Sequence, residues 1–91
     1  MAGVPVATGD NAEPLVLVSR SYCHLCQDME AAVAPLALEF GVGLKVLDVD
    51  ADAELEARYD ELVPVLLHRG NELCHYFLDG LKVREYLAGI R

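Results

Sequence analysis

The chain has 91 residues, of which 54% are hydrophobic and 24% are charged, and this balance excludes an intrinsically disordered polypeptide. Seven basic against 15 acidic residues leave a net charge of −8, which disfavours nucleic acid and anionic membrane surfaces as partners. No secretory signal is visible, and no stretch approaches the roughly 18 apolar residues of a membrane span. We therefore expect one monomeric, cytoplasmic domain over residues 14–91, preceded by a flexible leader over residues 1–13.

The first half of the domain has the pattern strand, helix, strand. An apolar run over residues 15–18 predicts a buried strand, and after a polar turn the apolar period becomes helical. The helical stripe is formed by Leu25, Met29, Val33, Leu36 and Phe40. Pro35 is expected to kink this helix without ending it, and Gly41 to end it in the left-handed conformation. Residues 44–49 predict a second strand, parallel to the first because the connection between them is long.

The second half predicts one short helix and two further strands, over residues 53–59, 63–68 and 72–77. Asp50 or Asp52 is expected to cap the short helix. Gly70-Asn71 predicts a two-residue hairpin turn between the two strands. Asp79 can cap a final helix, whose apolar stripe is Val83, Leu87 and Ile90. The order β-α-β-α-β-β-α therefore predicts an α/β domain with a four-stranded mixed sheet flanked by helices.

Two cysteines separated by two residues follow the first predicted strand. Cys23 and Cys26 can reach each other within one helical turn, so they can cycle between a dithiol and a disulfide. The N-terminus of the following helix directs free backbone N–H groups and a partial positive charge at the first sulfur. We therefore expect Cys23 to be the nucleophilic thiolate and Cys26 the resolving thiol.

With these features the chain resembles glutaredoxins, a branch of the thioredoxin-fold oxidoreductases, and in particular small bacterial glutaredoxin-like proteins. The resemblance covers residues 15–90 and rests on the cysteine pair, on Arg20, on Val63-Pro64 and on the order of the elements. It implies a thioredoxin/glutaredoxin-like fold. It also implies that Arg20, where glutaredoxins usually have a lysine, helps to hold a glutathione carboxylate. The Val63–Pro64 bond would then be cis, beside the active site, with the backbone of Val63 available to an extended peptide.

The chain departs from the glutaredoxin pattern at two places. His24-Leu25 stands between the cysteines instead of Pro-Tyr or Pro-Phe, and a protonated His24 would be a second cation near Cys23. Asp79-Gly80 stands where glutaredoxins usually have two glycines and further polar groups that bind glutathione. Asp79 is therefore either a glutathione ligand or, more simply, a helix cap. Tyr22 can stack on a thiol-bound substrate or pack beside the turn.

The leading hypothesis is a thiol–disulfide oxidoreductase that reduces protein disulfides or glutathione mixed disulfides. No bound cofactor and no metal ion are expected. Glutathione is a possible co-substrate, and either glutathione or a thioredoxin-type reductase would supply the electrons.

Two alternatives remain open at this point. Cys23 and Cys26 could bind zinc together with Cys74 and a histidine, or could bridge an iron–sulfur cluster between two chains. The chain could also be a thioredoxin-fold interaction module without catalytic activity. By default, Cys74 is expected to be a small buried hydrophobe, and His68 and His75 to lie on or near the surface.

Overall fold

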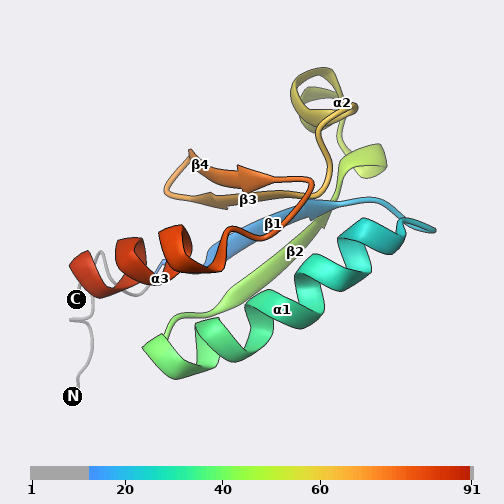
Figure 1. Cartoon of the computed structure of the whole chain (residues 1–91). Helices are drawn as coiled ribbons and strands as arrows, with labels where there is room; N and C mark the ends of the chain where they lie inside the picture. The colour runs from blue at the N-terminus through green and yellow to red at the C-terminus, as the bar shows by residue number, and fades with distance from the viewer. Residues whose placement is uncertain (1–12, 91) are drawn as a thin grey trace, which may run out of the picture.

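A four-stranded mixed sheet forms the centre of the computed structural model, which describes residues 13–90 (Figure 1). The strands are β1 (Leu15–Ser19), β2 (Leu44–Asp48), β3 (Val65–His68) and β4 (Asn71–His75). Their spatial order is β2-β1-β3-β4, with β1 parallel to β2 and antiparallel to β3, and β3 antiparallel to β4. The predicted combination of a parallel βαβ half and an antiparallel hairpin is therefore confirmed. The predicted leader lies outside the described residues, except for Glu13.

The helices of residues 13–90 are α1 (His24–Phe40), α2 (Ala53–Tyr59) and α3 (Gly80–Gly89), and a 3₁₀ turn, η2 (Val49–Ala51), follows β2. As predicted, α1 continues through Pro35 and ends at Gly41, whose φ of 70° is left-handed. Asp52 caps α2 by accepting hydrogen bonds from the N–H groups of Glu54 and Leu55. None of these helices has both the length and the apolar character that crossing a membrane requires.

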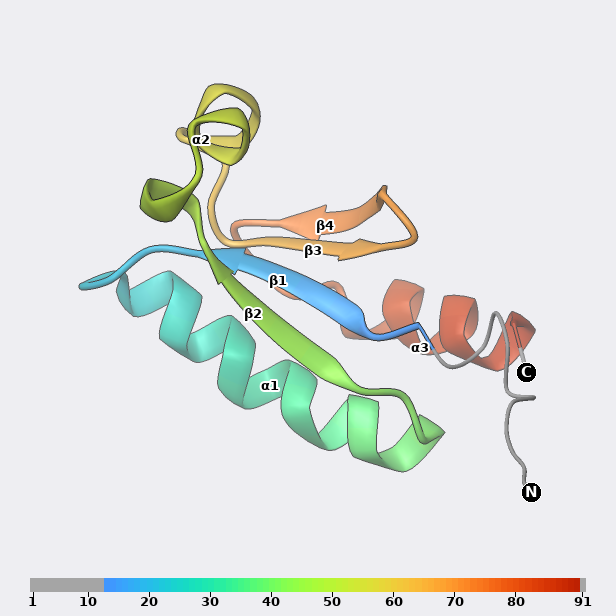
Figure 2. The same ribbon diagram turned by 180° about the vertical axis from the view of Figure 1, so that it is seen from behind.

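The two faces of the sheet carry separate core clusters, and both views of the ribbon show α1 and α3 on one face (Figures 1 and 2). The cluster beneath α1 and α3 includes Leu17, Leu66, Val33 and Val83, all fully buried. The cluster on the other face is formed by Val18, Val49, Val65 and Leu67, with partly buried residues of α2 packed against it. Because β1 and β3 are covered on both faces, residues 15–18 and 65–67 within them are continuously apolar rather than alternating.

The hairpin between β3 and β4 turns one residue earlier than the sequence predicts. His68 pairs with Asn71, so the two turn residues are Arg69 and Gly70 rather than Gly70 and Asn71. Both have positive φ, of 54° and 79°, which is the conformation of a type I′ turn. β4 also ends at His75 instead of Phe77, because Tyr76 leaves the extended conformation with a φ of 64°.

His68 was expected near the surface, and this prediction is wrong. Its side chain is fully buried, with Nδ1 2.6 Å from the Tyr86 hydroxyl of α3 and Nε2 3.1 Å from the Glu13 carbonyl oxygen. All four residues of β3 are buried, so no position on this strand leaves room for a surface side chain. His75, by contrast, is exposed as predicted and contacts Glu72.

Candidate redox site

Cys23 and Cys26 form a disulfide at the N-terminal end of α1, with their Cα atoms 5.1 Å apart. Cys23 is the N-cap residue, and its extended backbone (φ −108°, ψ 110°) ends the loop that leaves β1. Its Sγ accepts a hydrogen bond from the backbone N–H of Cys26 at 3.1 Å. Cys23 is partly exposed, whereas Cys26 is only 3% exposed. Cys23 is therefore the more accessible of the two cysteines.

The start of α1 is electrostatically suited to a negatively charged sulfur. The N–H group of Cys26 lies where it would also stabilise a thiolate on Cys23 after reduction. The aligned peptide dipoles of this 17-residue helix add a partial positive charge at the same end. No acidic residue occupies the first turn to oppose that charge. These features favour a thiolate on Cys23, and its role as the attacking group stays a prediction.

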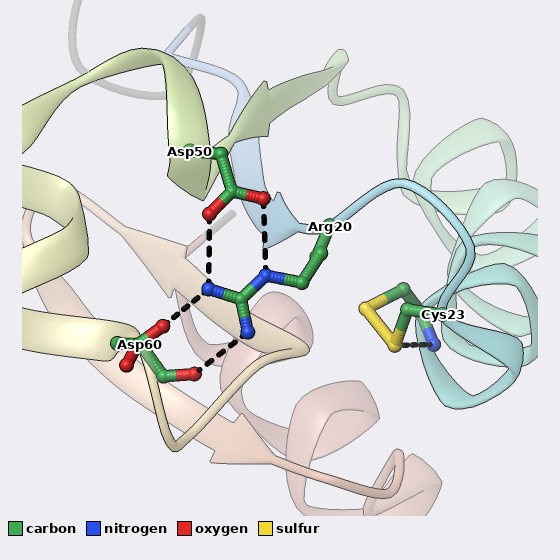
Figure 3. The surroundings of a disulfide bond; sticks show 5 residues. Arg20, Cys23, Asp50 and Asp60 are labelled. Atoms are coloured by element: carbon green, nitrogen blue, oxygen red, sulfur yellow. Dashed lines mark hydrogen bonds and ion pairs between the residues drawn. A yellow bond between two sulfur atoms is a disulfide. The ribbon is translucent and has the colours of Figure 1, made fainter.

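Arg20, three residues before Cys23, is held by two carboxylates. Nε and Nη2 donate to the two carboxylate oxygens of Asp50 at 3.1 and 3.0 Å. Nη2 also contacts the Asp60 carboxylate, and Nη1 donates to the Asp60 carbonyl oxygen at 3.3 Å. Figure 3 shows the guanidinium between these two aspartates, extending away from Cys23. The hydrogen bonds from Arg20 lower the pKa of Asp50, so its carboxylate stays ionised.

The structure therefore gives Arg20 partners other than the glutathione carboxylate that the resemblance implies. The sequence predicts Asp50 only as a possible helix cap and indicates no role for Asp60. The two pairs join residues that are 30 and 40 positions apart, and no local pattern reports such a distance. The substrate-binding role of Arg20 stays a prediction, and a contact through two hydrogen bonds would require the guanidinium to release one of these partners.

The Val63–Pro64 peptide bond is cis, and Pro64 lies at the end of the sheet from which the Cys23 loop leaves. The register places this proline, because Val65 pairs with Val18, close to the end of β1. Pro64 is buried, and its carbonyl oxygen accepts a hydrogen bond from the Tyr76 N–H at 2.9 Å. The loops after β1, before β3 and after β4 thus meet at the same end of the sheet.

The other predicted substrate-binding residues differ in their exposure and contacts. Tyr22 is 99% exposed, with a positive φ of 64°, and His24 is an exposed residue at the start of α1. Asp79 caps α3 and accepts a hydrogen bond from the Lys82 N–H at 3.1 Å, which confirms its simpler predicted role. A Cβ at Gly80 would contact nothing within 4 Å, so no close approach requires a glycine there. Binding of glutathione by Asp79 and Gly80 remains a prediction.

An apolar groove of about 260 Å³ lies beside the cysteine pair, and the sequence analysis did not predict it. Its walls come from α1 and from the segment after β4: Leu25, Asp28, Met29, Ala32, Tyr76, Phe77 and Leu78. Phe77 is 68% exposed and Leu25 37% exposed, so both offer apolar surface to a partner. The helical spacing of the four α1 residues was visible in the sequence, but the loop that completes the groove was not.

A second hollow, of about 230 Å³, lies on the other side of the start of α1. It is lined by Ser19, Arg20, Ser21, Tyr22, Cys26, Gln27, Glu30, Val46 and Asp48. Cys26 therefore borders this hollow, whereas Leu25, its neighbour in the chain, borders the apolar groove.

Cys74 lies apart from this arrangement, on β4, where it pairs with Leu66 and packs against the core beneath α1 and α3. Partial burial raises the pKa of its thiol, which keeps it protonated and poorly nucleophilic. Among the described residues, the side chains that lie close enough together to bind a metal ion are three exposed carboxylates, those of Asp50, Glu56 and Asp60. Two of them, Asp50 and Asp60, already bind Arg20. The sulfur-rich metal site considered above, with Cys74 and a histidine, is therefore not assembled in residues 13–90.

Both the sequence and the fold of this chain have known relatives. Residues 14–88 match the family described as Glutaredoxin-like domain (DUF836). The chain is similar to the solution structure of protein Ne2328 from Nitrosomonas europaea, with 36% identity, a TM-score of 0.73 and coverage of 82% of this chain and 91% of that one. It is also similar to Fasciola hepatica thioredoxin, with 26% identity, a TM-score of 0.57 and coverage of 89% and 85%. An uncharacterized protein of Mycobacterium tuberculosis is 29% identical over 77 residues, 79% of either chain.

Proposed function

The chain belongs to the glutaredoxin-like (DUF836) family and has a thioredoxin-like fold, and we therefore propose that it is a thiol–disulfide oxidoreductase. A cysteine pair at the start of the first helix of this fold supports a redox role. The observation that carries the proposal is the N-cap position of Cys23, whose sulfur already accepts a backbone hydrogen bond. That position gives the sulfur both exposure and stabilisation as a thiolate, which are the two requirements of an attacking thiol.

The reaction would proceed in two exchange steps on the reduced protein. The Cys23 thiolate attacks one sulfur of the substrate disulfide, forms a mixed disulfide and releases the other substrate sulfur as a thiolate. The Cys26 thiol then loses its proton and attacks the Cys23 sulfur, which releases the second substrate thiolate. Two electrons pass to the substrate, and the Cys23–Cys26 disulfide remains on the protein. A thiol reductant restores the dithiol.

The proposed substrates are protein disulfides or glutathione mixed disulfides of proteins. Glutathione is proposed as a co-substrate rather than a bound cofactor, and either it or a thioredoxin-type reductase would return the electrons. A reducing cytosol supplies both donors, so we propose that the protein works there, as a monomer.

Substitution of single cysteines tests the assignment of roles. Cys23→Ser is expected to abolish reduction of a model disulfide, because it removes the attacking sulfur. Cys26→Ser is expected to block dithiol turnover and to trap substrate on Cys23, since no second thiol can release it. Cys74→Ser is the matched control and is expected to retain the wild-type rate. Stopped-flow turnover and mass spectrometry of trapped adducts measure these outcomes. Full activity of Cys23→Ser would refute the proposal.

Equilibration of the Cys26→Ser protein with oxidised and reduced glutathione tests the choice of co-substrate. A glutathione adduct on Cys23 that reduced glutathione removes rapidly would support a glutathione-linked enzyme. Absence of that adduct, while the wild-type protein still cycles its Cys23–Cys26 disulfide, would instead support a thioredoxin-like enzyme with protein partners. Mass spectrometry of the intact protein distinguishes the two.

A further inference from the structure

We infer that this redox site selects polypeptide disulfides whose cysteine is flanked by basic and apolar side chains, and that Asp50 and Asp60 set the charge preference by neutralising Arg20. The inference rests on the proposed function and names the substrate class of the same site. It follows from the charges that line the two hollows beside the cysteine pair and from the apolar wall of one of them.

The charge of Arg20 is more than balanced by its two partners. Asp50 binds the guanidinium through two hydrogen bonds, and Asp60 contacts it through both its carboxylate and its carbonyl oxygen. The three side chains together carry a net charge of about −1 when all are ionised. An anionic substrate that approaches Cys23 therefore meets no unpaired cation at Arg20. Four of the five N–H groups of this guanidinium already donate to Asp50 and Asp60, so only one Nη1 N–H group is left for a substrate.

The other ionised groups that line the two hollows are acidic. Asp28 lies in the apolar groove, and Glu30 and Asp48 line the hollow that Cys26 borders. Apart from the paired Arg20, neither hollow has a lysine or arginine among its lining residues. The net charge of −8 extends this negative potential over the whole protein. A substrate with basic side chains beside its disulfide is attracted to the site, whereas an acidic substrate is repelled.

The groove supplies the apolar part of the recognition. Leu25, Tyr76 and Phe77 form its accessible wall, and these side chains are 37%, 40% and 68% exposed. Leu25 lies between the two cysteines in the chain, so the groove begins close to the Cys23 sulfur. A substrate side chain that binds in this groove therefore belongs to a residue near the substrate's own reacting cysteine. Aromatic and aliphatic walls of this kind bind an apolar side chain by removing its surface from water. The combination of this wall with Asp28 fits a segment that is both apolar and basic.

Two model peptides that differ only in charge provide the test. Each contains one cysteine, disulfide-linked to a reporter thiol, with a leucine beside it; one carries two lysines and the other two glutamates in the flanking positions. Prereduced protein attacks the disulfide, the reporter thiol is released and Cys26 resolves the mixed disulfide. At low ionic strength the lysine peptide is expected to react about tenfold faster than the glutamate peptide. In 1 M salt, where the Debye length is about 3 Å, this ratio is expected to fall toward one.

Two variants of the Arg20 contacts shift the ratio in opposite directions. The double variant Asp50→Asn/Asp60→Asn removes the two negative charges that neutralise the guanidinium and is expected to lower the preference for the lysine peptide at least about threefold. Arg20→Gln leaves the two carboxylates unbalanced and is expected to raise it. A general effect of altered folding would not change sign between these variants, so the direction of the shift identifies the charge effect.

A pair of substitutions on α1 provides a second, independent test of the charge preference. Asp28→Asn removes a carboxylate from the groove and is expected to lower the preference for the lysine peptide. Glu39→Gln removes the same charge 16 residues after Cys23, about 24 Å along the helix axis, and is expected to leave the ratio unchanged. The comparison remains valid even if the double aspartate variant does not fold, because neither substitution touches the Arg20 contacts.

The outcomes separate this inference from the proposed function. Equal rates for the two peptides at low salt, or a faster glutamate peptide, would overturn the inference while leaving the oxidoreductase assignment intact. Equal shifts in Asp28→Asn and Glu39→Gln would also overturn it, because the preference would then come from net charge alone. Failure of both peptides to react with Cys23 would refute the proposed function and the inference together.

Discussion

His68 lies fully buried beneath α3 with an oxygen atom close to each ring nitrogen. The Glu13 carbonyl can only accept, so Nε2 carries a hydrogen and donates to it. In the neutral ring Nδ1 is then the acceptor for the Tyr86 hydroxyl, 2.6 Å away. The two contacts connect β3 to α3 and to Glu13, which lies just before β1. A single side chain therefore links three segments that the sheet alone does not hold together.

Removal of this imidazole is expected to destabilise the protein. His68→Leu fills similar space but leaves the Tyr86 hydroxyl and the Glu13 carbonyl without their partner, at a cost of roughly 1–3 kcal/mol. His75→Leu removes an exposed histidine from the next strand and is expected to change the free energy of unfolding by less than about 0.5 kcal/mol. Urea unfolding followed by circular dichroism measures both. Equal, small effects would contradict the assigned role of His68.

The β3–β4 hairpin shows how element geometry depends on single backbone conformations. Arg69 and Gly70 both adopt positive φ, which suits the right-handed twist of the paired strands. Arginine pays a steric cost in this region that glycine does not. Arg69 is exposed, and its side chain takes part in none of the hydrogen bonds and ion pairs found in residues 13–90, so no such contact compensates for this cost. The turn is thus held by strand pairing and by Gly70.

Two alanine substitutions test the demand for glycine in this turn. Gly70→Ala is expected to lower the free energy of unfolding by about 1 kcal/mol, because alanine is strained at a φ of 79°. A Cβ at Gly70 meets nothing within 4 Å, so this cost is purely conformational. Gly89→Ala, where the added Cβ is also free of contacts, is expected to be neutral or slightly stabilising because it lies in a helix. Thermal or urea unfolding compares them, and a neutral Gly70→Ala would exclude this conformational requirement.

At the scale of the whole molecule, the Arg20 contacts join the loop after β1 to the η2 turn and to the residue after α2. Asp50 belongs to η2, and Asp60 follows α2 and lies four residues before Pro64. The loop that presents Cys23 and the segment that leads to Pro64 are therefore connected through one guanidinium (Figure 3). This connection links the two segments at the end of the sheet where the candidate redox site lies.

These contacts are expected to stabilise the folded protein at neutral pH but not near pH 2. Arg20 lowers the pKa of Asp50 in the folded state, so the unfolded chain binds a proton more readily. The contribution is complete above the unfolded pKa, about 3.9, and is lost as the pH falls through the lower folded value. Arg20→Gln should therefore be less stable than wild type at pH 7 and approach it near pH 2. Urea unfolding across this range measures the difference.

Lys45→Gln is the control for that experiment, because Lys45 is an exposed cation on β2 outside the Arg20 contacts. It changes the net charge by the same amount and is expected to have a small effect at every pH. A pH profile for Arg20→Gln that matches the profile of Lys45→Gln would show that net charge, rather than the Asp50 contact, is responsible.

Many structural features of this protein could be predicted from residues that are close together in the sequence. The helical period of α1, its end at Gly41, the caps Asp52 and Asp79 and the position of the cysteine pair are set by contacts within a few residues. Such patterns also predict the order of the elements, and this order was sufficient to predict a mixed four-stranded sheet. The chemistry of the redox site follows from the same local features, since a helix begins where the cysteines lie.

The tertiary structure decided which distant groups meet. It gave Arg20 two carboxylate partners 30 and 40 positions away, buried His68 against Tyr86, and completed the groove beside Leu25 with Tyr76 and Phe77. These contacts depend on how the strands align and on which face the helices cover. Hydrophobic periodicity specifies that a face is buried, but it does not specify which residue lies opposite. The pairings and the charge environment of the site therefore emerge only when the chain is folded.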